Sequence, residues 1–235
     1  MQKITLLAGL IFFILSASAQ DNKSVCDKIN NLNTAILNGQ IKRPDAAKQF
    51  KTLINQLRQN RHVPEALDGW VFPLRKYNYH AIGGNGSGYS DKGYHYLDGN
   101  KHSAHPAHDI FINDKNQDCL DDKSSKPVDV LAVDYGIVIA CSNEWEPTSG
   151  LRGGKYIWIN DNYGQLIYYA HNQAIFVKPG DEVKAGQTIA RVGRTGYNAY
   201  KKRSPTHLHF SAFKLVDDLP VPYNPYEQLK KAKTL

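Results

Sequence analysis

The chain has 235 residues, of which 41% are hydrophobic and 22% charged, and its formal net charge is +7. This length and composition predict one domain of ordinary size with a small additional module, and a core that needs neither a metal nor a disulfide for stability. The positive charge is dispersed rather than gathered in a basic helix or stripe, which argues against nucleic acid as a partner.

Residues 1–19 have the pattern of a secretory signal peptide. Lys3 supplies the positive start, residues 4–15 are almost wholly apolar, and the small residues 17–19 form a cleavage site. The apolar run is too short for a membrane span, and no cysteine directly follows it, so we expect neither stable membrane insertion nor a lipid anchor. We expect an exported protein, periplasmic or secreted. Its net charge of +6 after loss of Lys3 favours anionic surfaces such as acidic cell-envelope polymers.

Residues 20–68 predict an N-terminal helical segment made of two short helices. Asn38-Gly39 separates them, and Pro44 suits the first turn of the second helix. The apolar residues at helical spacing are Val25, Ile29, Leu32 and Ile36, followed by Phe50, Leu53, Ile54 and Leu57. We expect a helical hairpin that packs on the main domain. A packing role is favoured over a partner-binding or inhibitory role.

Residues 69–225 are dominated by strand and turn signals. Apolar and β-branched runs at 128–140, 156–159, 166–169 and 177–192 are separated by turns rich in Asp, Asn and Gly. The predicted fold is mainly β, an antiparallel sheet or sandwich with long loops at one end and the short helical hairpin appended. Residues 226–235 are left as a C-terminal tail.

Three cysteines in an exported chain allow one disulfide and one remaining thiol. Cys119–Cys141 is the favoured pair, because both lie in the predicted β domain while Cys26 lies in the helical segment. No C-x-x-C sequence occurs, which argues against a zinc site built from thiolates.

Two clusters of histidine suggest a metal site of another kind. His207-Leu208-His209 lies on a predicted strand, where alternate side chains share a face, so His207 and His209 lie on one face and Leu208 on the other. About a hundred residues earlier, His105 and Asp109 supply a second imidazole and a carboxylate. Two histidines and one carboxylate are a typical ligand set of catalytic zinc, which keeps one position open for water.

Five motifs in order give the chain a family resemblance. They are His105-x-x-x-Asp109, Tyr169-Ala170-His171, the Gly-Asp-x-Val-x-x-Gly-Gln pattern within 177–189, Gly193-x-Thr195-Gly196, and His207-Leu208-His209-Phe210. Together they resemble the lysostaphin/LytM-type zinc endopeptidases, which cut peptide bonds in bacterial peptidoglycan. The resemblance covers roughly residues 72–213.

The resemblance implies a role for each matching residue. His105, Asp109 and His209 correspond to the zinc ligands, and His171 and His207 to the two catalytic histidines that do not bind the metal. One of these two would take the proton of the zinc-bound water, and the other would stabilise the oxyanion or protonate the leaving amine. The sequence does not assign which does which. We also expect Tyr169 to share the face of His171 at the end of a strand.

The chain departs from the family pattern around the first motif. Ala107 replaces a glycine that is common two residues before the ligand aspartate, and His108 directly precedes Asp109, facing away from it if the segment is extended. Residues 113–126 resemble an insertion. Three further histidines are expected to be exposed loop residues, and three tyrosines could line the groove: His80, His95 and His102, and Tyr89, Tyr94 and Tyr96.

These observations predict an exported zinc endopeptidase acting on peptidoglycan peptides. The alternative is a non-enzymatic LytM-like protein that binds or activates other wall hydrolases; complete retention of the five residues favours the enzyme. The pattern within 177–189 also occurs in lipoyl and biotinyl carrier domains, but the lysine–methionine hairpin tip of those domains is missing. Neither G-x-S-x-G nor H-E-x-x-H occurs, which argues against serine hydrolases and helix-based zinc proteases. The bond that is cut, the oligomeric state and regulation by the helical segment stay open.

Overall fold

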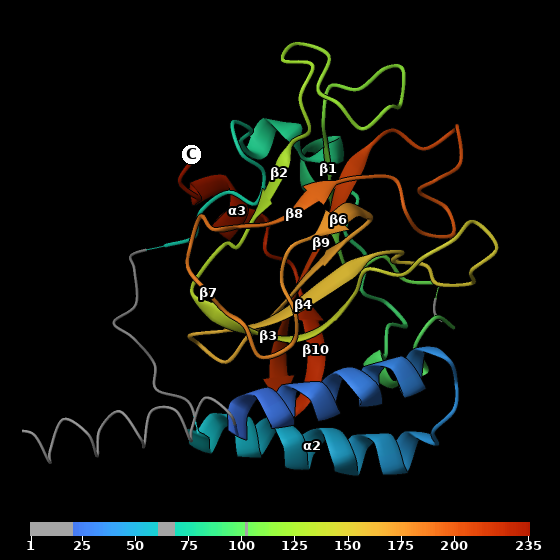
Figure 1. Ribbon diagram of the computed structural model, residues 1–235, viewed down its shortest axis with the longest axis vertical. Helices are drawn as coiled ribbons and strands as arrows, with labels where there is room; N and C mark the ends of the chain where they lie inside the picture. Colours follow the sequence, from blue (N-terminus) through green and yellow to red (C-terminus); the bar gives the residue numbers. More distant parts are fainter. Residues whose placement is uncertain (1–20, 61–68, 102) are drawn as a thin grey trace, which may run out of the picture.

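The computed structural model describes residues 21–60, 69–101 and 103–235 (Figure 1). The predicted signal peptide and residues 61–68 lie outside these ranges. Within them, no helix combines the length and the apolar character needed to cross a membrane.

In the described ranges, ten strands form two antiparallel sheets, as the sequence predicts. The larger sheet has seven strands in the order β1-β9-β5-β4-β3-β7, with β10 also paired to β9, and the smaller has three in the order β2-β8-β6. The strands are β1 (His108–Phe111), β2 (Asp129–Leu131), β3 (Gly136–Ser142), β4 (Tyr156–Asp161), β5 (Leu166–Ala170), β6 (Asn172–Ile175), β7 (Glu182–Val183), β8 (Thr188–Val192), β9 (His207–Val216) and β10 (Leu219–Tyr223). The helical elements are residues 21–37, α2 (Arg43–Asn60), α3 (Tyr226–Lys231) and the short 3-10 turns η1 (Tyr79–Ala81), η2 (Gly83–Gly86) and η3 (Tyr96–Asp98).

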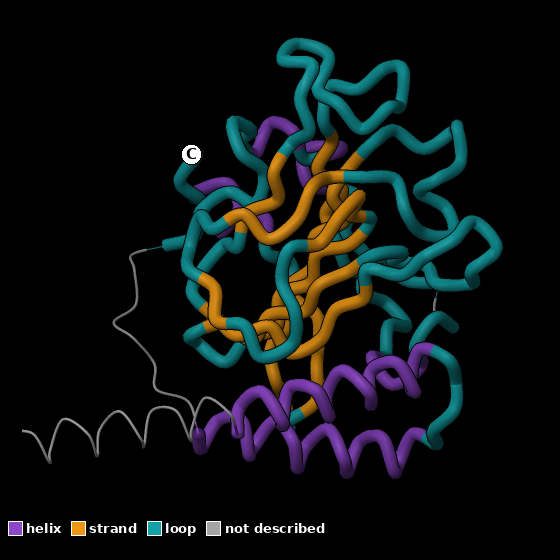
Figure 2. Tube along the Cα trace, in the orientation of Figure 1, coloured by secondary structure: helices purple, strands orange, loops and turns teal. Residues whose placement is uncertain are grey.

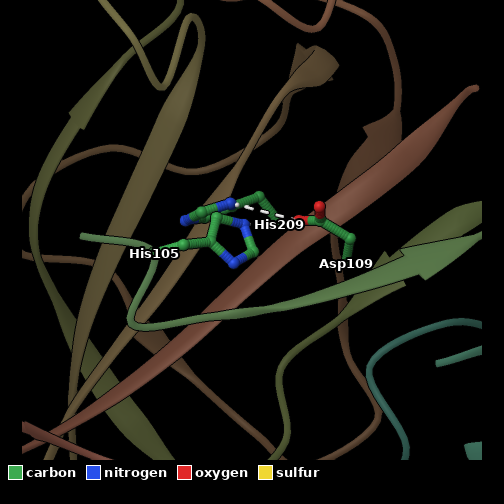
Figure 3. A group of neighbouring side chains, drawn as sticks. All are labelled: His105, Asp109 and His209. Carbon is green, nitrogen blue, oxygen red and sulfur yellow. Dashed lines mark hydrogen bonds and ion pairs between the residues drawn. The ribbon is translucent and has the colours of Figure 1, made fainter. Parts of the chain in front are cut away.

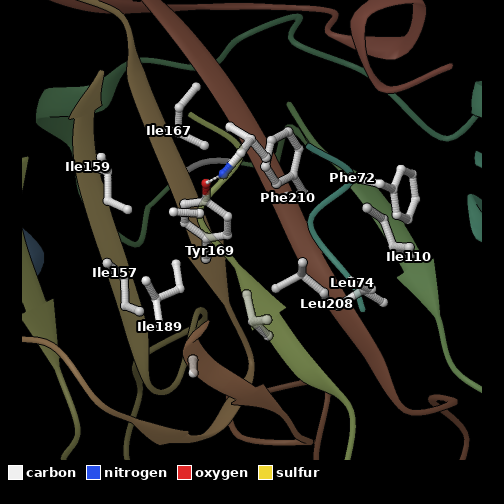
Figure 4. Close-up of a cluster of buried hydrophobic side chains, with 14 of the residues drawn as sticks. Phe72, Leu74, Ile110, Ile157, Ile159, Ile167, Tyr169, Ile189, Leu208 and Phe210 are labelled. Carbon is white, nitrogen blue, oxygen red and sulfur yellow. Dashed lines mark hydrogen bonds between the residues drawn. The ribbon is translucent and has the colours of Figure 1, made fainter. Parts of the chain in front are cut away.

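One face of the larger sheet packs against the smaller sheet and α3. On β9 this face carries Leu208 and Phe210, both fully buried, and Tyr169 of β5 packs edge-on against Phe210 (Figure 4). Ile189 of β8 and Leu229 of α3 belong to the same cluster. This is the main core, and it fixes which side chains of β4, β5 and β9 face the opposite way.

The opposite face of the same sheet carries the helical hairpin. The two helices lie side by side, as Figure 2 shows, and all the predicted stripe residues are buried except Leu53, which is partly buried. They share a second core with Trp158 of β4 and Phe213 of β9. Polar contacts add to it, since the Asn33 side chain donates to the Tyr156 hydroxyl at 2.8 Å. The hairpin therefore packs on the domain as predicted and has no separate core.

The predicted Cys119–Cys141 disulfide is wrong. The Cys119 amide donates to Asp114, whose carboxylate also accepts from Thr206 just before β9. Cys141 lies on β3, four strands from β1 in the sheet order, and its amide donates to Asn30 of the first helix. Both cysteines are free thiols, each held by contacts to other parts of the fold.

Residues 226–235, predicted as a tail, contain α3 and pack on the domain. Leu229 is fully buried in the main core, and the Lys233 amide donates to the carbonyl of Trp70 at 2.8 Å. The C-terminal residues are therefore hydrogen-bonded to the segment around Trp70, where the β domain begins.

We expect Phe50→Ala to lower the free energy of unfolding by about 3–5 kcal/mol, because truncation of a buried aromatic side chain leaves a cavity. Phe50 is 1% exposed and its ring centroid lies 5.2 Å from that of Tyr96. Urea denaturation followed by circular dichroism measures the change. Lys48→Ala, at an exposed site on the same helix, is the control and should stay within about 0.5 kcal/mol. A separate early transition for the helices would contradict a shared core.

Candidate metal centre

The three predicted ligands lie together at the junction of β1 and β9. Asp109 of β1 is directly opposite His209 of β9 in the sheet register, so both side chains emerge on one face. His105, four residues before Asp109, turns back toward it (Figure 3). The Asp109 Oδ1 atom lies 3.2 Å from His105 Nε2 and 3.3 Å from His209 Nδ1.

One ligand atom from each of these residues can be chosen so that all lie within 4.8 Å of one another. Two imidazoles and one carboxylate at this spacing suit a zinc ion with three protein ligands. The donor set of this pocket therefore fits the metal that the sequence predicts.

His171 and His207, the two predicted catalytic histidines, lie against this group. The His207 Nε2 atom is 3.6 Å from Asp109 Oδ1, and the His171 ring centroid lies 4.9 Å from that of His207 and 5.3 Å from that of His209. Their roles stay a prediction, and their positions are those the prediction requires.

Backbone carbonyls orient three of the four imidazoles. The Nδ1 atoms of His105, His171 and His207 lie 3.0, 2.7 and 2.7 Å from the carbonyl oxygens of Gly88, Thr195 and Pro205, respectively. A carbonyl can only accept, so each Nδ1 carries a proton, which leaves the Nε2 lone pair available when the ring is neutral. Such contacts fix the ring and the tautomer of a metal-site histidine.

His171 reaches the site through an unusual backbone conformation. β5 ends at Ala170, and His171 has φ +65°, a left-handed value that is uncommon outside glycine. The expectation that Tyr169 shares its face is wrong: Tyr169 points into the main core, where its hydroxyl accepts from the Val133 amide at 3.0 Å. The left-handed residue breaks the alternation of the strand.

Gly196 makes room for the His171 ring. It has φ +114°, and a Cβ atom there would lie 2.7 Å from His171 Nδ1. The neighbouring Thr195 supplies the carbonyl that accepts from the same nitrogen. The Gly193-x-Thr195-Gly196 motif thus acts by holding His171.

Burial and hydrogen bonds set the charges of the group. Burial tends to raise the pKa of Asp109, but hydrogen bonds from His105 and His209 outweigh it and hold that pKa well below its usual range. Burial lowers the pKa of His209 and, more strongly, that of His171. The hydrogen bond to Asp109 raises the pKa of His105. The Asp109 carboxylate is therefore held in its ionised form, the form that binds a cation.

The other histidines named from the sequence, among the described residues, do not belong to the His105–Asp109–His209 group. His108 faces away, as expected, with its Nε2 atom 2.8 Å from Asn224 Oδ1. His80 and His95 are not among the clustered ligands, and His102 lies outside the described residues.

All five predicted site residues line one pocket of about 250 Å³. Two of the predicted tyrosines, Tyr94 and Tyr96, line it as well, while the Tyr89 hydroxyl instead donates to Asp91. The lining residues that sequence reasoning missed include Arg152, Trp158, Tyr168, Ser211 and Phe213. Ser211 and Phe213 could have been found by continuing the two-residue alternation beyond His209. Trp158 and Tyr168 could not, because their placement depends on the register of β4, β5 and β9.

Residues 116–221 match the sequence profile described as Peptidase family M23. This segment, which is less than half of the chain, is similar to peptidase family M23. The matched segment holds His171, His207 and His209, whereas His105 and Asp109 precede it. The place of these two residues in the group therefore rests on the geometry above.

Curated relatives and solved structures are similar over parts of the chain. Outer membrane antigenic lipoprotein B of Histophilus somni is 49% identical over 61 residues, which are 26% of this chain and 16% of that protein. Murein hydrolase activator NlpD of Escherichia coli K12 is 39% identical over 92 residues, which are 39% of this chain and 21% of that protein. The catalytic domain of lysostaphin from Staphylococcus simulans is 27% identical, with 56% of this chain and 83% of that chain covered and a TM-score of 0.40. The chain spans only about a fifth of the length of these curated relatives.

Asp109→Ala should weaken zinc binding by more than about 100-fold, because even the loss of an outer hydrogen-bond partner of a ligand costs about 10- to 100-fold. Competition with a chromophoric chelator, together with the metal content after dialysis, measures the change. His80→Ala, which removes an imidazole outside the group, is the control and should keep the wild-type affinity. Unchanged affinity in Asp109→Ala would exclude Asp109 as a ligand.

Proposed function

We propose that this protein is an exported zinc-dependent endopeptidase that hydrolyses peptide cross-links or stem peptides of bacterial peptidoglycan. The observation that carries the proposal is the convergence of the His105–Asp109–His209 group with His171 and His207 in one pocket. The M23 match supports peptidase chemistry at the level of the family.

A zinc ion held by His105, Asp109 and His209 would supply a Lewis acid that activates water and polarises the scissile carbonyl. His171 and His207 provide the proton transfers. Each has its Nδ1 proton committed to a backbone carbonyl, so its Nε2 atom can accept a proton and later return it to the leaving amine. Both side chains are nearly buried, 9% and 5% exposed as residues, and so are preorganised for this task.

The substrate class and the location are supported by the relatives. One is named as a murein hydrolase activator and another as an outer membrane lipoprotein, and these names agree with an envelope location and the export predicted from residues 1–19. The partners proposed for this chain are therefore peptidoglycan peptides.

Digestion of purified peptidoglycan by the mature chain, residues 20–235, tests the proposal directly. We expect loss of cross-linked muropeptides and the appearance of new free amines by mass spectrometry, abolition of both by a chelator, and recovery on adding zinc. Stoichiometric zinc binding without cleavage of peptidoglycan would contradict the proposed substrate.

Replacement of either catalytic histidine should leave zinc bound and lower the cleavage rate by about 10²- to 10⁴-fold, the usual contribution of acid–base catalysis. His207 lies on a strand and is replaced by alanine. His171 is replaced by asparagine, because its backbone is left-handed at φ +65° and asparagine adopts that conformation more readily than alanine. Zinc content and muropeptide cleavage are measured on the same samples, with His95→Ala as the control. A variant that keeps the wild-type rate would remove its residue from the mechanism.

A non-enzymatic activator of other wall hydrolases is the second candidate, favoured by the 39% identity to the murein hydrolase activator of Escherichia coli K12. The two functions separate in the Asp109→Ala variant. An endopeptidase loses its effect on peptidoglycan with this substitution, whereas an activator that works through its surface still stimulates an added hydrolase.

A further inference from the structure

Arg152 places one permanent positive charge in the wall of the metal pocket. Among the described residues that line this pocket, Asp109 is the one acidic residue, and Arg152 is the one lysine or arginine. Arg152 is half-buried and lines the same pocket as His105 and Asp109. Neither the sequence motifs nor the proposed proton transfers use this residue.

The backbone around Arg152 is tied to both sides of the pocket. The Arg152 amide donates to Asn100 Oδ1 at 3.3 Å, and the Asn100 Nδ2 atom donates to the Leu37 carbonyl at the end of the first helix, at 3.2 Å. On the other side, the Gly153 carbonyl accepts from the His171 amide at 2.9 Å. Arg152 therefore sits on a fixed segment between the helical hairpin and a catalytic histidine.

The first helix and the loop after η3 close this side of the pocket. The Tyr96 hydroxyl donates to Asn33 Oδ1 at 3.2 Å, and a Cβ atom on Gly99 would lie 2.6 Å from the Ile36 carbonyl oxygen. Tyr96, Gly99, Asn33 and Ile36 all line the pocket. The two segments are thus in contact, and Arg152 shares the pocket lining with aromatic and aliphatic residues.

We propose that Arg152 determines specificity by binding a carboxylate of the peptide substrate next to the scissile bond. A guanidinium offers paired N–H donors that match a carboxylate, and such charged hydrogen bonds are stronger where water is excluded. The inference rests on the proposed function for the identity of the ligand as a peptide. The carboxylate is either the terminal one or that of a side chain, because both present the same two oxygens.

The test compares muropeptides with free carboxylates and the same muropeptides after carbodiimide amidation. For free carboxylates, Arg152→Gln should raise KM about 10- to 100-fold, as expected for a hydrogen bond to a charged group, with kcat within about threefold and zinc content unchanged. On the amidated muropeptides, wild type and Arg152→Gln should be alike. Arg152→Lys should recover part of the affinity. Arg191→Gln, which removes the same charge outside this pocket, is the matched control.

Two further measurements separate the outcomes. Calorimetry with the His207→Ala variant, with and without Arg152→Gln, measures binding of the free muropeptides in the absence of cleavage. If binding depends on Arg152 but the wild-type protein cleaves no muropeptide, the proposed function is wrong and this inference stands. Muropeptides blocked only at the terminal or only at the side-chain carboxylate show which group is bound. The inference would be overturned if Arg152→Gln and Arg191→Gln changed KM equally. It would also be overturned if blocking the terminal carboxylate and blocking the side-chain carboxylate both left KM unchanged.

Discussion

The arrangement of the molecule depends on the alternation of side chains along β9, the strand of the larger sheet that pairs with β1, β5 and β10. Leu208, Phe210 and their neighbour Ala212 are buried in the main core, which fixes the strand face. His207 and His209 must then emerge on the other face, where Asp109 lies opposite His209. Because a shift of one residue would exchange the two faces, burial of the apolar residues also sets the position of the metal group. Stability and site geometry thus have the same cause here.

The second constraint is the backbone that surrounds the imidazoles. Three of the four rings are held by carbonyl oxygens, and one of these carbonyls belongs to the Thr195 loop, which passes close to His171 only because Gly196 has no side chain. The left-handed conformation of His171 has a cost of about 1–3 kcal/mol, which the buried hydrogen bonds around it offset. Strain of this kind persists where the surroundings determine the conformation, and here it places an imidazole beside the His105–Asp109–His209 group.

Local patterns in the sequence were enough for much of this fold. The stripes ending in Ile36 and Leu57 predict the helices and their buried faces, and the alternation around His207-Leu208-His209 predicts which imidazoles share a face. The errors arise where distant segments decide the outcome. His171 leaves the strand pattern through contacts with the Thr195 loop, and Cys119 is held by Asp114 beside β9 rather than near Cys141. Arg152 carries no motif, so only the folded chain brings it to the pocket.

The metal pocket also draws on parts of the chain that the M23 match does not include. The match begins at residue 116, after His105 and Asp109 and well after the first helix, whose Asn33 and Ile36 line the pocket. Because the hairpin packs on the same sheet face that carries His207 and His209, it occupies space along the groove next to the metal group. A ligand of the pocket would therefore approach from the remaining sides. The helices, which look from sequence like a structural addition, share a core with the sheet and shape the pocket at the same time.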